Sequence, residues 1–197
     1  MDLLSVLRQD YKFIEENLHA DNDGLWGRTF IKTAISLIEA EIYMLKQELL
    51  IYCRENKVSL NPEFTLFLEN KKYEINSNGK VKERLLQVRL KDDIKFVFDQ
   101  ITTLKNHRLC RGYDDPDWSK VNITVAVRNR LTHPKSIECM LVSKQEVNDC
   151  KLAFNWCIHN LVYFLEQDKS DIELKYAKKI EDLEMRERIL SQGAEST

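Results

Sequence analysis

The sequence predicts an all-α fold, a helical bundle of about five core helices followed by a C-terminal helix. Apolar residues recur every three to four positions over long stretches, which is the spacing of the buried face of an α-helix. Glycine and proline, which interrupt helices, number only five and three among 197 residues. A chain of this length, 43% of it hydrophobic, is expected to build one core.

Local signals delimit the helices. Asp2 provides an N-cap for the first helix, and the second helix carries the longest apolar stripe of the chain. Pro134 ends the fourth helix, and Ser143 with Glu146 forms a capping box at the start of the fifth. In chain order, the helices are expected over residues 2–20, 25–56, 82–106, 118–132, 143–166 and 171–190.

Residues 57–81 do not follow the helical pattern. A turn begins at Asn61-Pro62, and residues 73–81, which include Gly79, fit either a small β-hairpin or a surface loop. We therefore treat residues 57–81 as an insertion in a helical domain that spans residues 1–167.

Residues 168–197 are expected to form a charged C-terminal helix and tail. Such a segment either docks on the bundle or pairs with another chain, and its apolar spacing alone does not decide between the two. Its narrow apolar stripe consists of Ile172, Tyr176, Ile180, Leu183 and Leu190.

The composition predicts a cytoplasmic protein with no membrane span. The N-terminus has no basic stretch ahead of an apolar run, and charged residues interrupt the most apolar region, residues 30–51. The cysteines are odd in number and lack the spacing of a disulfide framework, which favours reduced thiols. They are Cys53, Cys110, Cys139, Cys150 and Cys157.

Charge is distributed unevenly along the chain. The net charge is −2, so the molecule as a whole does not attract nucleic acid. Residues 105–135, however, contain seven Lys and Arg against three Asp. This basic island fits either a local anion site or ordinary solvated surface charge.

Several catalytic classes lose support. No glycine-rich phosphate loop, dinucleotide-binding glycine fingerprint or G-x-S-x-G turn occurs in the sequence. The His and Cys residues lack the paired short spacings of a structural zinc site. We therefore expect neither a metal site nor a cofactor.

A compact polar segment at the end of the fourth helix is the candidate site. Asn129 and His133 are four residues apart and share a helix face, whereas Arg128 lies about 140° from His133 around an ideal helix. Pro134 disfavours helical geometry at His133, so the last turn is expected to fray. On spacing alone, Arg128 and Arg130 would complement the helix dipole while His133 caps the helix.

The segment Arg128-Asn129-x3-His133 resembles the R-x(4–6)-H signature of the HEPN family, in its common form with a polar residue directly after the arginine. The order of the elements also resembles that family, because a long earlier helix carries an acidic residue, here Glu39 or Glu41. The motif is the specific part of the resemblance.

The resemblance covers residues 2–166 and implies an all-α bundle that forms a two-fold homodimer, with two copies of the motif facing each other across a cleft. It implies a metal-independent endoribonuclease with a composite active site, an RNA substrate, and products that carry a 2′,3′-cyclic phosphate and a 5′-hydroxyl. Many active members are toxins or antiviral-defence effectors, and a toxin would be accompanied by an antitoxin protein.

The residue types suit this chemistry. A histidine exchanges protons near neutral pH, so His133 is expected to act as general acid or base. Arg128 is expected to stabilise the charge on phosphorus, and Asn129 to orient the phosphate or the attacking hydroxyl. Glu39 or Glu41 is expected to hold Arg128 or to polarise His133.

The other cations of the basic island are expected to support this site. Arg130 supports the motif itself. The RNA-binding residues are expected to be Lys105, Arg108, Arg111, Lys120 and Lys135.

The alternative function is a non-catalytic module of the same fold, which serves dimerisation or binds RNA or a nucleotide. In that case Arg128 and His133 are structural.

Overall fold

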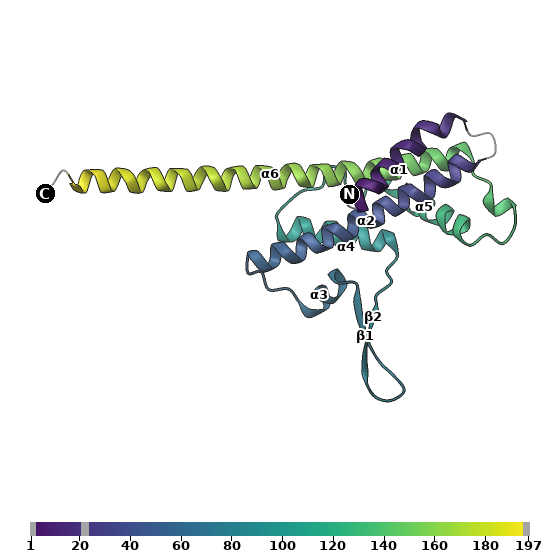
Figure 1. The fold of residues 1–197 in the computed structure, drawn as a ribbon, viewed down its shortest axis with the longest axis horizontal. Helices are drawn as coiled ribbons and strands as arrows, with labels where there is room; N and C mark the ends of the chain where they lie inside the picture. The colour runs from purple at the N-terminus through teal and green to yellow at the C-terminus, as the bar shows by residue number, and fades with distance from the viewer. Residues whose placement is uncertain (1–2, 21–23, 195–197) are drawn as a thin grey trace.

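The computed structural model describes residues 3–20 and 24–194 and confirms the fold class, a mostly helical bundle with one small β-hairpin (Figure 1). Asp2, the predicted N-cap, lies outside the described residues. In chain order the elements are α1 (Leu3–Asn17), η1 (Leu18–Ala20), α2 (Leu25–Glu55), α3 (Pro62–Leu68), β1 (Lys71–Ile75), β2 (Val81–Leu85), α4 (Leu90–Leu104), α5 (Pro116–Thr132), η2 (Glu138–Met140) and α6 (Lys144–Ala194).

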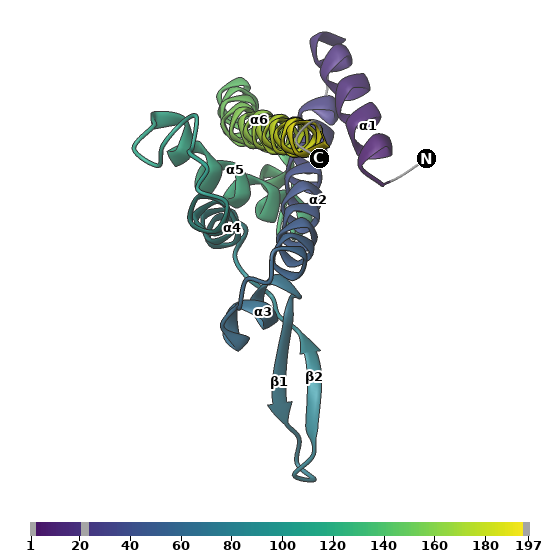
Figure 2. The same ribbon diagram turned by 90° about the vertical axis from the view of Figure 1, so that its left-hand side faces the viewer.

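Helix α2 lies at the centre of the bundle. It packs against α1, α3, α4, α5 and α6 (Figure 2). Phe30 of α2 and Phe98 of α4 are fully buried, and the Phe98 ring packs against Trp156 and Phe164 of α6 at centroid distances of 5.8 and 5.2 Å. The core therefore lies between α2, α4, α5 and the first half of α6, where the apolar faces of these helices are buried against one another.

Helix α6 is one uninterrupted helix of 51 residues, which corrects the prediction of two helices over residues 143–166 and 171–190. The intervening residues 167–170 contain neither glycine nor proline, so nothing in the backbone stops the helix. Within the residues that the structure describes, no helix is both long and apolar enough to cross a membrane.

The start of α6 follows the predicted capping box. The backbone N–H of Glu146 donates to Ser143 Oγ at 3.1 Å, and the Ser143 N–H donates to Glu146 Oε2 at 2.8 Å. These two hydrogen bonds satisfy groups that the first turn of a helix leaves unpaired. The boundary was therefore predictable from two residues alone.

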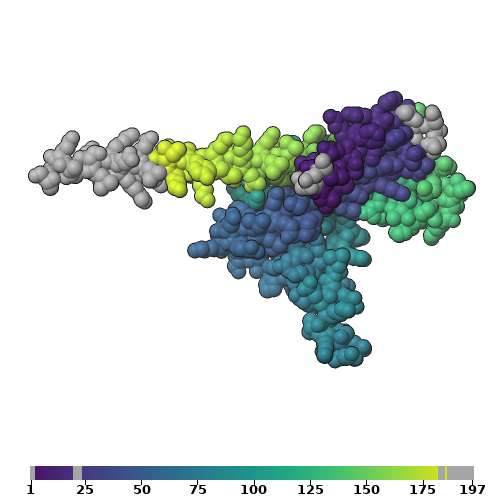
Figure 3. Space-filling model, viewed as in Figure 1, coloured from purple at the N-terminus to yellow at the C-terminus, as the bar shows by residue number. Residues whose placement is uncertain are grey.

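The second half of α6 projects away from the bundle (Figures 1 and 3). Every side chain from residue 171 to residue 181 is exposed, including those of Ile172, Tyr176 and Ile180. The predicted apolar stripe therefore does not dock on the bundle over this part. Leu183 and Leu190, which would continue it, lie outside the described side chains.

The β-hairpin agrees with one of the two alternatives for residues 73–81, but most of its second strand occupies residues that the sequence assigned to a helix. Strands β1 and β2 pair antiparallel, with Lys71 opposite Leu85 and Ile75 opposite Val81. Helix α4 therefore begins at Leu90, not at residue 82, and the insertion extends beyond its predicted end at residue 81. Residues 82–84 are three consecutive charged residues that suit a helix, but they lie in a strand whose side chains are all exposed.

Candidate functional site

Helix α5 carries Arg128 and Asn129 beside the face that it buries. Burial of one face against α2 and α6 leaves these two polar residues at the edge of the bundle. The buried face, at helical spacing, consists of Trp118, Val121, Thr124, Val127 and Leu131.

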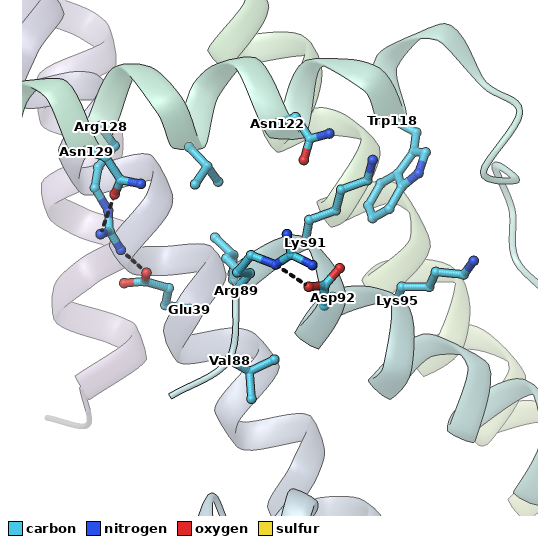
Figure 4. Close-up of a pocket in the computed structure, with 12 residues that line it drawn as sticks. Glu39, Val88, Arg89, Lys91, Asp92, Lys95, Trp118, Asn122, Arg128 and Asn129 are labelled. Atoms are coloured by element: carbon cyan, nitrogen blue, oxygen red, sulfur yellow. Dashed lines mark hydrogen bonds and ion pairs between the residues drawn. The ribbon is translucent and has the colours of Figure 1, made fainter. Parts of the chain in front are cut away.

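Two neighbours hold the guanidinium of Arg128 (Figure 4). Its Nη2 donates to Oε1 of Glu39 on α2, and its Nη1 donates to Oδ1 of Asn129 at 3.1 Å. The side chains of Arg128 and Glu39 are 28% and 42% exposed, so the ion pair stays open to solvent. The packing of α5 on α2 thus brings together residues that lie 89 positions apart.

His133 lies just beyond the helix, as Pro134 predicted. It is the C-cap of α5, with φ −125° and ψ 61°, and its backbone N–H donates to the carbonyl of Asn129 at 3.0 Å. Its side chain is exposed and does not line the pocket that contains Arg128. One chain therefore does not bring Arg128 and His133 into a common pocket.

The two candidate acids differ in what they contact. Glu39 pairs with Arg128, whereas Glu41 accepts from Arg8 of α1, with Nη2 to Oε1 at 2.6 Å. Residues two positions apart point to opposite sides of a helix, so only one of them faces α5. Glu39 is therefore the acid beside the motif, and its role there stays a prediction.

Arg130 ties together the segments that follow the motif. Its Nη2 donates to Oε1 of Glu146 at 2.6 Å, and its Nη1 donates to the carbonyl oxygens of Cys139 and Leu141 at 3.2 and 2.7 Å. These contacts anchor η2 and the start of α6. Arg130 is thus in contact with the framework around the motif and does not line the pocket that contains Arg128.

The predicted RNA-binding cations do not gather beside Arg128. Lys105 and Lys120 pair with Asp168 and Asp149 of α6 at 2.8 and 3.0 Å. Lys105 also lies 5.3 Å from the ring of Tyr52, which is 13 residues from Glu39 along α2, or about 20 Å on a straight helix.

The remaining three cations of that set are also dispersed. Arg111 pairs with Asp115 and Asp117 at 2.9 and 2.6 Å, ahead of and at the start of α5. Arg108 and Lys135 are exposed, the first beyond α4 and the second beyond α5. The basic island in the sequence is therefore not a single surface in the fold.

A pocket of about 630 Å³ lies between α5, the start of α4 and Glu39 of α2 (Figure 4). Arg128 and Asn129 line one end of it. Arg89, Lys91 and Lys95 also line it, and all three lie outside the basic island. Sequence reasoning missed them because it counted charge in one continuous window, although Lys91 and Lys95 already share a helix face by their spacing.

Comparison with known proteins gives no relative. The chain matches no protein-family model, no curated protein and no solved structure. Among the side chains that the structure describes, no group of three or more His, Cys, Asp and Glu is arranged to hold a metal ion.

Proposed function

We propose that the protein is a metal-independent endoribonuclease, acting as a homodimer and serving as a toxin or defence effector. The observation that carries the proposal is the arrangement at the end of α5. Arg128 lies at a pocket, oriented by Glu39 and Asn129, while His133 is exposed just beyond the helix end. These are the residue types that cleavage of a phosphodiester by its own 2′-hydroxyl needs.

Arg128 supplies the charge for the transition state. A guanidinium carries five N–H donors, and the contacts with Glu39 and Asn129 use one on each terminal nitrogen. Three donors then stay available for a phosphate, enough for a bidentate contact. Glu39 and Asn129 therefore fix the plane of the guanidinium and still leave N–H donors for a phosphate.

His133 moves the protons. Its imidazole takes the proton of the ribose 2′-hydroxyl, the oxygen attacks phosphorus, and the bond from phosphorus to the 5′-oxygen breaks. A protonated imidazole gives its proton to the leaving 5′-oxygen. The products are a 2′,3′-cyclic phosphate and a 5′-hydroxyl. The imidazole that acts as the base, His133 of one copy, ends protonated, and the imidazole that acts as the acid, His133 of a second copy, ends neutral.

A second copy of the chain supplies the complementary residues. His133 does not share a pocket with Arg128 of its own chain, whereas a two-fold contact over the ends of α5 would place each motif against its mate. We therefore propose a composite site in which each subunit contributes Arg128 and His133. A toxin of this kind would have an antitoxin protein as a further partner.

The alternative is a non-catalytic RNA- or nucleotide-binding module. The ion pair between Arg128 and Glu39 favours it, because a purely structural arginine makes the same contact. Thermal stability separates the two functions. If His133→Ala lowers the melting temperature markedly, the imidazole belongs to the framework; an unchanged value supports a functional site.

The nuclease proposal is tested with total RNA and tRNA in excess EDTA. The proteins are wild type, His133→Ala and His159→Ala, the last being a matched control at an exposed position on α6. Wild type and the control are expected to cleave, and His133→Ala to leave the RNA intact, with equal helicity in all three. Cleavage by His133→Ala at the wild-type rate would overturn the proposal, and cleavage by a monomer would overturn the composite site.

A further inference from the structure

The pocket at Arg128 continues along α5 as an elongated groove. Figure 4 shows Arg128 and Glu39 at one end, Arg89 between, and Lys95 with Trp118 at the other. Trp118 and Asn129 lie eleven positions apart on α5, which corresponds to about 16 Å of helix. The groove is therefore longer than a single phosphate group.

The groove is cationic although the protein is acidic. Four of its lining residues are Lys or Arg and two are acids, Glu39 and Asp92, which leaves an excess of two positive charges against a net charge of −2 for the whole chain. Arg128 pairs with Glu39, and Arg89 Nε donates to Asp92 Oδ2 at 2.7 Å. The excess charge therefore resides on the two lysines of α4.

Lys91 and Lys95 are positioned by aromatic rings. Lys91 Nζ lies 5.1 Å from the ring centroid of Trp118, and Lys95 Nζ lies 5.3 Å from that of Tyr113. Among the described side chains, no carboxylate forms an ion pair with either ammonium group. A ring orients an ammonium group without cancelling its charge, and its three N–H donors stay available for an anion.

We propose that this groove binds the phosphodiester backbone of the RNA strand next to the scissile phosphate, with Lys91 and Lys95 each contacting a phosphate. An extended polyanion fits better than a single phosphate group, because separated cations line the length of the groove. Asn122, exposed on the same wall, adds an amide that can donate to a phosphate or a ribose hydroxyl. This inference rests on the proposed function for the identity of the polyanion.

Binding is measured separately from cleavage. The probe is a fluorescein-labelled single strand of about twelve nucleotides in which every ribose is 2′-O-methylated, so that no 2′-hydroxyl can attack. Fluorescence anisotropy over a range of salt concentrations gives Kd and its salt dependence. The proteins are wild type, Lys91→Gln/Lys95→Gln, and the control Lys12→Gln/Lys178→Gln, which makes the same charge change at exposed positions on α1 and α6.

The groove variant is expected to bind about five- to tenfold more weakly than wild type, while the control binds normally. The slope of log K against log salt becomes shallower by about 1.4, since each contact with a single-stranded phosphate contributes about 0.7. Unchanged circular dichroism and melting temperature show that the variant is folded. Lys95→Glu is expected to weaken binding more than Lys95→Gln does, because it places a negative charge in the groove.

Equal binding by wild type and the groove variant would overturn the inference, as would absence of binding by wild type. The two proposals fail separately. If wild type cleaves RNA but the groove variant binds the probe normally, the nuclease stands and the groove does not. If the groove variant binds weakly but no protein cleaves RNA, the groove stands as a binding site and the nuclease does not.

Discussion

Lys46 is a charged side chain enclosed in the core. It is fully buried, its Nζ lies 2.5 Å from Asp93 Oδ1, and it donates to Asn70 Oδ1 at 2.7 Å. The same ammonium lies 4.9 Å from the ring of Phe67. One buried cation therefore joins α2 to α4 and to the segment between α3 and β1.

Removing the partner of a buried charge is costly, because the charge is left without compensation. We expect Asp93→Asn to lower the free energy of unfolding by about 3 kcal/mol, measured by urea denaturation. The neighbouring Asp92→Asn is the matched control, because it breaks an exposed pair with Arg89 and should cost less than about 1 kcal/mol. Equal losses in both variants would contradict the role of Lys46.

The cysteines should differ in how their reactivity depends on pH. Hydrogen bonds from the backbone at Lys135 and from Ser136 lower the pKa of the Cys139 thiol, whereas burial raises the pKa of Cys150 and Cys157 to about 12. The thiolate is the reactive form, so a lower pKa shifts alkylation to lower pH.

At neutral pH, iodoacetamide followed by mass spectrometry should therefore show Cys139 modified while Cys150 and Cys157 are protected. Ser136→Ala should move the Cys139 profile to higher pH, because one hydrogen bond to the thiolate is lost. The same Cys139 profile in the folded protein and in urea would show that the fold does not perturb this thiol.

At the scale of elements, the projecting part of α6 is separable from the bundle. Along the described part of α6, the last ion pair with the bundle is the 3.3 Å approach of His107 Nε2 to Asp171 Oδ2, and the side chains of residues 172–181 are exposed. A chain that stops after Lys175 should keep its melting temperature within about 2 °C of the full-length protein. Asp168→Ala, which removes the partner of Lys105, should lower it by more than this truncation does.

That truncation also tests whether the segment after Lys175 is independent of the bundle. A large fall in melting temperature would mean that the distal segment stabilises the bundle, either directly or through a second chain. Light scattering on both forms distinguishes these two cases, because only the second changes the molar mass.

Element boundaries were predictable where a side chain marks them. Ser143 with Glu146 placed the start of α6, and Pro134 placed the end of α5 within one residue. The hairpin was only one of two alternatives, and its second strand was missed, because Val81–Leu85 is exposed on both faces and carries no burial pattern. The continuity of α6 was missed because a change in composition was interpreted as a break.

The candidate site was predictable only as far as it is contiguous in sequence. Arg128, Asn129 and His133 form a local motif, and Glu39 was one of two acids expected beside it. The choice of Glu39 over Glu41 depends on which face of α2 meets α5, and that is a matter of packing. Arg89, Lys91 and Lys95 join the pocket only through the same tertiary contact.

For the whole molecule, the separation between Arg128 and His133 has the largest consequence. A chain that acted alone would have the arginine that we propose to bind phosphate in a pocket, and the histidine that we propose to transfer protons outside it. The proposed homodimer would remove this difficulty, because Arg128 of one copy could then meet His133 of the other. The nuclease chemistry and the homodimer are therefore one linked proposal.

The most direct measurement is the identity of the ends that the protein leaves on RNA in excess EDTA. Fragments are treated with a 2′,3′-cyclic phosphodiesterase activity and with polynucleotide kinase, and the ends are read by mass spectrometry. We expect 2′,3′-cyclic phosphate and 5′-hydroxyl ends from wild type and none from His133→Ala. Fragments with 5′-phosphate ends, or intact RNA with both proteins, would contradict attack by the 2′-hydroxyl at a site built on Arg128 and His133.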